Sequence, residues 1–163
     1  MQQVVQEIKN LSIGFTSKKG EQISILKNIS TTINKGETVG IVGESGSGKS
    51  TLALAMMGYV KHGLFTISGE CIYQSNDILK MKNRELENIR GRKIAMIPQN
   101  AGQSLTPNLK IGYQIDEALR LHTNFQKEDR DVKISELLNK VRLPSPETIA
   151  KRYPHELSGG QQQ

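Results

Sequence analysis

Residues 43–50 read GESGSGKS, a glycine-rich loop that ends in a lysine and a serine. An apolar run, TVGIV at residues 38–42, precedes this loop, and STLALAMMG at residues 50–58 follows it with helical character. Loops of this composition bind phosphate when they join a buried strand to the start of a helix. The flanking segments supply that context, which a chance match in a glycine-rich turn would lack. The sequence therefore predicts an α/β fold built around a phosphate-binding loop.

The residue types of this loop indicate a nucleoside triphosphate and a metal ion as its ligands. Glycine lets the backbone curl so that successive N–H groups point at an anion. Lys49 is expected to reach the β- and γ-phosphates of ATP, and the Ser50 hydroxyl to hold Mg²⁺. The residues predicted to bind nucleotide here are Gly43, Glu44, Ser45, Gly46, Ser47, Gly48, Lys49, Ser50 and Thr51.

A second motif, LSGGQ, occupies residues 157–161. Ser158 is placed to cap a following helix, while Gly159 and Gly160 leave backbone N–H groups free to face an anion. The alternative is a flexible Ser-Gly-Gly turn before a helix. A second anion site in a chain that already has one indicates that two chains share each nucleotide, which predicts a dimer.

Composition and charge narrow the class of protein. The length of 163 residues suits one domain, and no run approaches the roughly 18 apolar residues of a membrane-spanning helix. The N-terminus lacks the apolar stretch of a signal peptide, so we expect a cytosolic protein in which the lone Cys71 is a buried strand residue. Six of the 22 basic residues lie between positions 80 and 93, but Glu85 and Glu87 are interleaved among them, so no nucleic-acid surface is expected.

Hydrophobic patterning divides the domain into two parts. Residues 1–99 are expected to contain a small antiparallel sheet within the first forty residues, a strand at 65–73, a helix at 78–89 capped by Asp77, and a buried strand at 93–97. Residues 100–163 begin with a loop at 100–107 and continue with helices at 111–122 and 129–143. Pro144, Pro146 and Pro154 interrupt the chain before the second motif.

With both motifs in place, the chain resembles the nucleotide-binding subunit of ABC transporters, from the start of that domain through its LSGGQ signature. The resemblance implies a P-loop NTPase core with an antiparallel β subdomain and an α-helical subdomain. In that family two domains sandwich two ATP molecules, which implies that Ser158, Gly160 and Gln161 contact ATP held by the loop of the partner. Gln99 matches the family's Q-loop glutamine, which contacts magnesium or the attacking water and couples to membrane subunits. Phe15 takes the place of the adenine-stacking residue; the alternative is a core aromatic in an edge strand.

Finer features resemble importers of oligopeptides, dipeptides and nickel. These are GIVGESGSGKS, the stretch ENIRGRKIAMIPQ at 87–99, SLTP at 104–107 and YPHE at 153–156. Those relatives usually carry an acidic residue and a proline directly after the glutamine, where this chain has Asn100 and Ala101. The resemblance implies an ATPase with ATP and Mg²⁺ as cofactors. It also implies a second ATPase subunit, integral membrane permease subunits and, indirectly, a solute-binding protein as partners, at the inner face of the cell membrane.

Two alternatives stay open at the level of sequence. One is a soluble ABC ATPase that serves DNA repair or translation, although such proteins usually carry coiled-coil insertions or tandem cassettes. The other is a fragment that captures nucleotide without turning it over, because the Walker B aspartate and the adjacent glutamate of the family are expected after residue 163. Loss of that strand is expected to leave backbone groups of residues 38–42 unpaired and the chain poorly stable.

Overall fold

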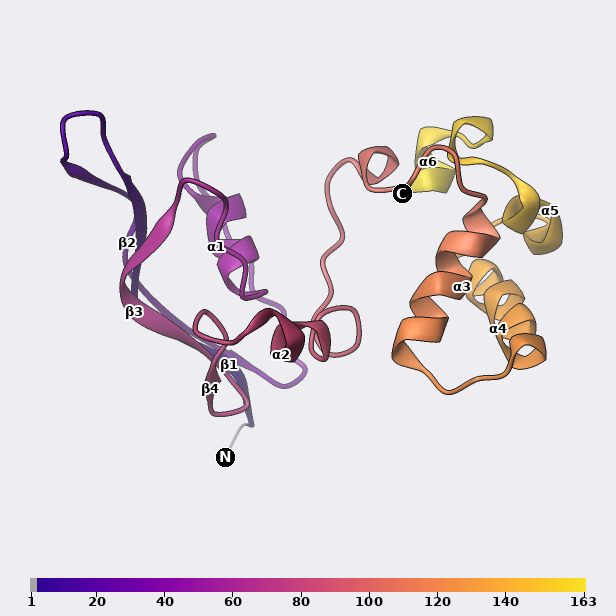
Figure 1. The fold of residues 1–163 in the computed structure, drawn as a ribbon, viewed down its shortest axis with the longest axis horizontal. Helices are drawn as coiled ribbons and strands as arrows, with labels where there is room; N and C mark the ends of the chain where they lie inside the picture. Colours follow the sequence, from indigo (N-terminus) through magenta and orange to yellow (C-terminus); the bar gives the residue numbers. More distant parts are fainter. Residues whose placement is uncertain (1–2) are drawn as a thin grey trace. The chain divides into compact units, whose positions relative to one another are not determined.

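The computed structural model describes residues 3–163, which form two compact units divided between Ile94 and Ala95. The first unit contains an antiparallel sheet with strand order β2-β1-β3-β4 (Figure 1). Its strands are β1 (Val4–Thr16), β2 (Gln22–Asn34), β3 (Phe65–Tyr73) and β4 (Asn76–Asp77). The small antiparallel sheet expected from the first forty residues and the strand at 65–73 are therefore confirmed.

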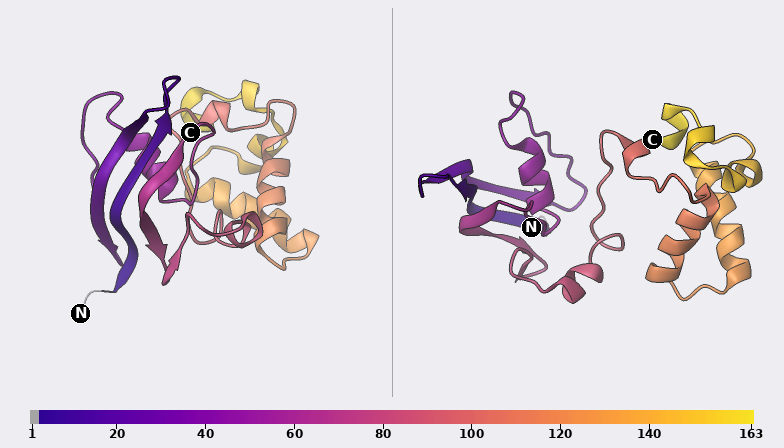
Figure 2. Two further views of the ribbon diagram at one scale, coloured as in Figure 1. Left: turned by 60° about the vertical axis from the view of Figure 1, so that its left-hand side comes forward. Right: turned by 45° about the horizontal axis from the view of Figure 1, so that its top comes forward.

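One face of this sheet is covered by helix α1 (Lys49–Ala55), as two views show (Figure 2). Leu52 and Ala55 of the helix are buried against apolar side chains of the three long strands. Burial of these side chains holds the helix on the sheet. Cys71 on β3 is fully buried in the same cluster, so the predicted buried strand cysteine is confirmed. The buried strand residues of this core are Ile8, Leu11, Ile13, Leu26, Cys71 and Tyr73.

The two predicted buried strands, residues 38–42 and 93–97, are not strands in the structure. Within residues 3–163, no strand pairs with either segment, and only an isolated parallel bridge joins Arg90 to Ile94. Their apolar side chains are correspondingly exposed, with Val42 at 97% and Ile97 at 80%. A strand needs a neighbour for its backbone hydrogen bonds, and these segments have none among the residues described.

The helix predicted at 78–89 is also wrong, because helix α2 covers only Asn83–Glu87. Asp77 does not cap it. The Asp77 carboxylate instead accepts hydrogen bonds from the backbone N–H groups of Cys71 and Leu79, at 3.2 Å each, and so holds the β3–β4 turn. Side chains that bond nearby backbone groups in this way compete with helix formation.

The second unit is helical. It contains the 3₁₀ turn η1 (Ala101–Gln103), α3 (Ile111–His122), α4 (Lys127–Lys140), α5 (Pro146–Lys151), the 3₁₀ turn η2 (Pro154–Glu156) and α6 (Gly159–Gln162). The predicted helix at 111–122 is confirmed, and the one at 129–143 lies at 127–140. Helix α5 was not predicted; Pro146 stands at its first turn, where proline is tolerated.

Helices α3, α4 and α5 share a small apolar core. Its buried residues are Ile111, Ile134, Leu138, Ile149 and Leu157. Arg130 of α4 pairs with Asp116 of α3, the guanidinium Nε lying 2.6 Å from the carboxylate. In the part of the chain that the structure describes, no helix has the length and hydropathy to span a bilayer.

Candidate nucleotide-binding site

The glycine loop lies between the extended residues 38–42 and the first turn of α1, with its backbone exposed to solvent. Gly46 and Gly48 have φ angles of 83° and 94°, the left-handed region that favours glycine. At Gly48 a Cβ atom would also lie 2.7 Å from Leu26 Cδ2 and 3.3 Å from the carbonyl oxygen of Ile25. Glycine at position 48 therefore lets the end of the loop rest directly on strand β2.

Lys49 turns back into the loop that precedes it. Its Nζ donates hydrogen bonds to the carbonyl oxygens of Gly43 at 2.7 Å and Glu44 at 2.6 Å. This ammonium group has three donors and is held beside exposed backbone, where an anion can reach it. The contact places the expected phosphate-binding charge inside the curve of the loop.

Ser50 and Thr51 follow Lys49 in the first turn of α1. The Ser50 side chain is exposed, and Thr51 is half-buried. Magnesium prefers oxygen ligands and usually keeps several waters alongside one or two protein groups and substrate phosphates. The exposed hydroxyl at Ser50 fits that donor set. Within residues 3–163, no group of three or more His, Cys, Asp or Glu side chains is arranged to hold a metal ion alone.

Phe15 lies near the end of β1, half-buried and paired with Ile23 of β2. It is two residues along the strand from the buried Ile13, and the β1–β2 register is irregular between them. Ile13 in turn pairs with Leu26, the residue that Gly48 approaches. The hairpin that carries Phe15 thus supports the end of the phosphate loop within the first unit.

The LSGGQ motif forms the start of helix α6. The Ser158 Oγ accepts a hydrogen bond from the Gln161 N–H at 3.4 Å, and the Gln161 Oε1 accepts one from the Ser158 N–H at 3.0 Å. This reciprocal arrangement is a capping box, so the predicted cap at Ser158 is present. Gly159 and Gly160 are exposed, and a Cβ on either would meet no atom within 4 Å. Space for a ligand or a partner is therefore open at this turn.

Gln99 is exposed and lies in the second unit, together with Ser158, Gly160 and Gln161. Helix α6 packs against η1, the turn that follows Gln99, and the Gln163 Nε2 donates to the Pro98 carbonyl oxygen at 3.3 Å. The signature and the Gln99 loop are therefore neighbours. The phosphate loop and Phe15 belong to the other unit.

Sequence reasoning missed two polar side chains at the far end of α1. Gln6 and Arg90 donate hydrogen bonds to backbone carbonyls that follow this helix. Arg90 lies within the stretch at 87–99 that resembles the importers, but that resemblance assigns it no role. Gln6 lies between Val5 and Glu7, and no local pattern marks it as a polar side chain that is buried to 7% exposure and needs a partner.

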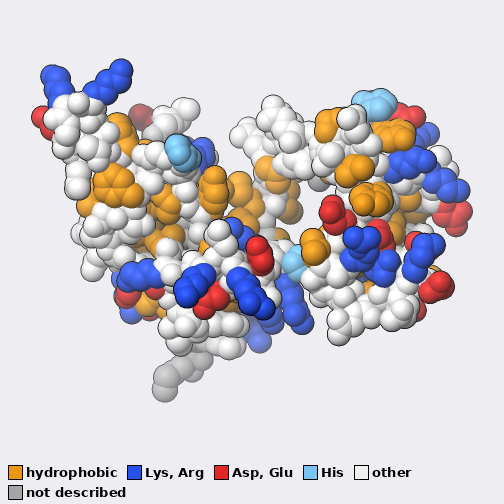
Figure 3. Space-filling model, in the orientation of Figure 1, with side chains coloured by type: hydrophobic (Ala, Val, Ile, Leu, Met, Phe, Trp, Pro, Cys, Tyr) orange, Lys and Arg blue, Asp and Glu red, His pale blue; other side chains and the backbone are white. Residues whose placement is uncertain are grey.

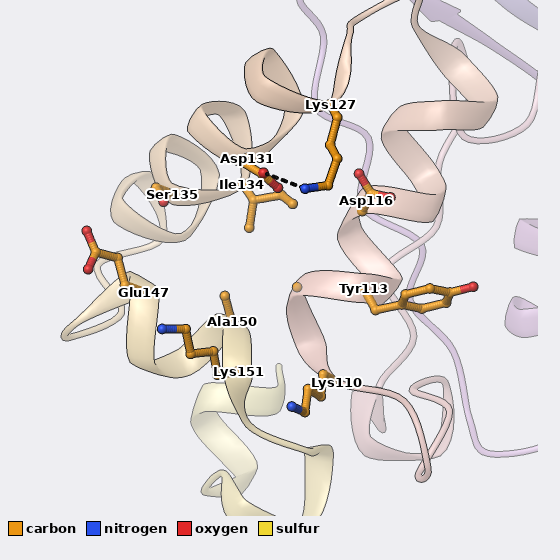
Figure 4. A pocket seen from close by; sticks show the side chains of 11 residues that line it. Lys110, Tyr113, Asp116, Lys127, Asp131, Ile134, Ser135, Glu147, Ala150 and Lys151 are labelled. Carbon is orange, nitrogen blue, oxygen red and sulfur yellow. Dashed lines mark ion pairs between the residues drawn. The ribbon is translucent and has the colours of Figure 1, made fainter.

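The second unit also has a cavity of about 470 Å³ between α3, α4 and α5 (Figure 4). Three basic and three acidic side chains line it, and Lys127 pairs with Asp131 at 3.7 Å along one edge. None of the predicted nucleotide-binding residues lines it. Its charged lining residues are Lys110, Asp116, Lys127, Asp131, Glu147 and Lys151.

Charge is mixed on the surface as well. Over α2 and the turns beside it, Lys and Arg side chains are interspersed with Asp and Glu (Figure 3). Lys80, for example, pairs with Asp77 at 3.0 Å. A phosphate backbone is bound by clustered basic groups, so this interleaved surface does not have the pattern that favours nucleic acid.

An antiparallel sheet that supports a phosphate-loop helix, followed by a helical unit that carries a glycine-rich signature, is the architecture of an ATP-binding cassette. Residues 26–163 match the family model described as ABC transporter. The chain belongs to the ABC transporter family.

The relatives agree with this assignment. The oligopeptide transport ATP-binding protein OppD of Bacillus subtilis strain 168 is 38% identical over 96% of this chain and 44% of its own length. The glutathione import ATP-binding protein GsiA of Escherichia coli strain K12 is 38% identical over 96% of this chain and 26% of its own. The chain thus spans less than half the length of these two relatives.

Solved structures share the fold. A dimeric post-hydrolysis state of the ATP-binding cassette MJ0796, bound to ADP and phosphate, superposes with a TM-score of 0.82 at 30% identity. The match covers 96% of this chain and 65% of that one. A bacterial Atm1-family ABC exporter with ATP bound has a TM-score of 0.64 at 22% identity, which shows the fold alone. The predicted fold class, an ABC ATPase cassette with an N-terminal antiparallel sheet and a helical part, is confirmed.

Proposed function

We propose that this protein is the ATP-binding subunit of an ABC importer, and that ATP binding and hydrolysis by the whole protein drive transport across a membrane. The observation that carries the proposal is the Lys49 ammonium group, held at 2.7 and 2.6 Å from two carbonyl oxygens of the glycine loop. Because the loop already curves around Lys49, the ammonium group can donate to phosphate oxygens in place of these two carbonyl oxygens when a nucleotide binds.

Each predicted residue has a part in this site. Lys49 binds the β- and γ-phosphates, the backbone from Gly43 to Gly48 cradles them, and Phe15 stacks on the adenine. The Ser50 hydroxyl holds Mg²⁺, which supplies neutralisation of phosphate charge when bound. Gln99 positions the magnesium or the attacking water.

A second cassette completes the site in this proposal. Ser158, Gly160 and Gln161 of one chain face the ATP on the phosphate loop of the other. The open turn at Gly159 and Gly160 supports this role, because it leaves room for the partner's nucleotide. The two units described above act as parts of one ABC domain. Permease subunits bind it at the inner face of the membrane, near Gln99, and a solute-binding protein acts through them.

The transported solute is proposed to be a peptide. OppD is named for oligopeptide transport and GsiA for glutathione import, and both names favour a peptide over the nickel ion that sequence features also allowed. Selectivity itself belongs to other subunits.

The experiment is ATP binding by the purified protein and its Lys49→Ala variant, measured by titration in the presence of Mg²⁺. Loss of a charge-assisted contact of about 1.5–3 kcal/mol should weaken binding by about 10- to 100-fold. Lys18→Ala, which removes the same charge from the exposed turn between β1 and β2, is the control and should bind like the parent. Equal affinity of the parent and Lys49→Ala would contradict the proposal. ATP-dependent peptide uptake by cells tests the transport part separately.

A further inference from the structure

Three consecutive carbonyl groups follow the end of helix α1, at Met56, Met57 and Gly58. Carbonyl groups just beyond the end of a helix accept no hydrogen bond from within it, so when they lie away from water they need another partner. Here side chains from distant segments bind all three. Gln6 Nε2 donates to the Met56 oxygen at 2.7 Å, while Arg90 Nε and Nη2 donate to the Met57 and Gly58 oxygens at 2.9 and 2.8 Å.

The Arg90 contact is specific in its geometry. The planar guanidinium presents two donors in a fixed fork, so it fixes both the distance and the direction of the two carbonyls that it bridges. Its charge also lies near the negative end of α1. The guanidinium further lies over the Tyr59 ring, 5.9 Å from the centroid. Each contact ties Arg90 to the same short stretch of chain.

The backbone on both sides of this contact is constrained. Gly58 has a φ angle of 70°, and a Cβ there would lie 2.7 Å from Leu86 Cδ2 and 2.9 Å from the Ile78 oxygen. Arg90 donates its own N–H to the Leu86 oxygen at 2.8 Å. Leu86, which bonds the Arg90 backbone, thus packs directly against Gly58, whose carbonyl the Arg90 side chain binds.

Helix α1 begins at Lys49 and has seven residues, so its length is about 10 Å. A helix this short moves as one body, and its far end sets the direction of its first turn. We infer that Arg90 is a positioning residue for the phosphate loop: by fixing the carbonyls of Met57 and Gly58, it sets where Lys49 and Ser50 meet the phosphates. This inference rests on the proposed ATP site. Gln6 assists from strand β1 through the Met56 carbonyl.

The test compares ATP affinity among variants that are folded at the assay temperature, as checked by urea unfolding. Arg90→Met is expected to weaken Mg-ATP binding by about tenfold. Loss of the fork displaces Lys49 and Ser50, and a small displacement of binding groups lowers affinity even when the substitution is remote from the ligand. Arg90→Lys keeps the charge but not the fork, and should recover only part of the affinity. The same losses of affinity should appear with inorganic triphosphate as the probe, because Arg90 is proposed to act on the contacts with the phosphates and not on those with the adenine base.

Two controls separate positioning from charge and from stability. Arg92→Met removes an exposed arginine two residues away, and Ile8→Val loosens the same core from β1. Both should bind ATP within about twofold of the parent, an effect well below 1 kcal/mol. The inference is overturned if Arg90→Met binds as tightly as the parent while Lys49→Ala does not. It is also overturned if Ile8→Val loses as much affinity as Arg90→Met. A parent protein that binds no ATP overturns both this inference and the proposed function.

Discussion

Gly46 and Gly48 share a positive φ angle but differ in their surroundings. At Gly46 a Cβ would meet nothing within 4 Å, whereas at Gly48 it would lie 2.7 Å from Leu26. Gly46→Ala should therefore cost only the backbone strain of about 1–2 kcal/mol, and Gly48→Ala that strain plus about 1–3 kcal/mol of overpacking. Urea unfolding of the two variants measures the difference. Equal losses would show that the loop does not rest on β2 as described.

The buried thiol of Cys71 makes stability depend on pH. Burial raises its pKa to about 11, against an opposing hydrogen bond from Gln6. Below about pH 8.5, the ordinary pKa of a thiol, both folded and unfolded states hold the proton. Between that pH and 11 the unfolded state releases it first, so the free energy of unfolding falls as pH rises, by roughly 2 kcal/mol between pH 8 and 10.5.

Cys71→Ala isolates this effect, because tyrosine and lysine titrations are common to both proteins. Urea unfolding at the two pH values should show a smaller fall for Cys71→Ala than for the parent. A fall of the same size in both would assign the pH dependence to other groups.

At the scale of elements, α3 and α5 meet at a glycine. A Cβ on Gly112 would lie 2.9 Å from the Ala150 carbonyl oxygen and 3.1 Å from its Cβ. Alanine favours a helix over glycine by about 1 kcal/mol, yet here it must push the α5 backbone away at a cost of about 1–3 kcal/mol. Gly112→Ala should therefore speed amide hydrogen exchange in α5. Glu117→Ala, on an exposed position of the same helix, should leave it unchanged.

The same scale shows which elements the sequence could predict. In helix α3 and strands β1 to β3 the apolar residues recur with the period of the element, so the sequence of each segment was enough to predict it. Residues 38–42 are as apolar as a buried strand, but a strand also needs neighbours, and pattern alone does not supply them. The Ser158 cap was predictable because capping is local. The Arg90 contacts join residues 32 and 33 positions apart, and no local signal marks such pairs.

At the scale of the whole molecule, the proposed shared site predicts complementation between two defective chains. Lys49→Ala impairs the phosphate loop, and Gly160→Asp places a carboxylate at the signature, where it would repel ATP phosphates. Gly160 is exposed with no atom within 4 Å of its Cβ position, so this change should not disturb the fold. Each variant alone should fail to form an ATP-dependent dimer in sedimentation velocity.

A mixture of the two variants should regain part of that dimer. In a mixed dimer, the loop of the Gly160→Asp chain meets the signature of the Lys49→Ala chain, and both halves of that one site are intact. Asn124→Asp, which adds the same charge to an exposed position in the loop between α3 and α4, should dimerise with ATP like the parent. If the mixture sediments as monomers under conditions where the parent and Asn124→Asp form dimers, the nucleotide is not shared between chains as proposed.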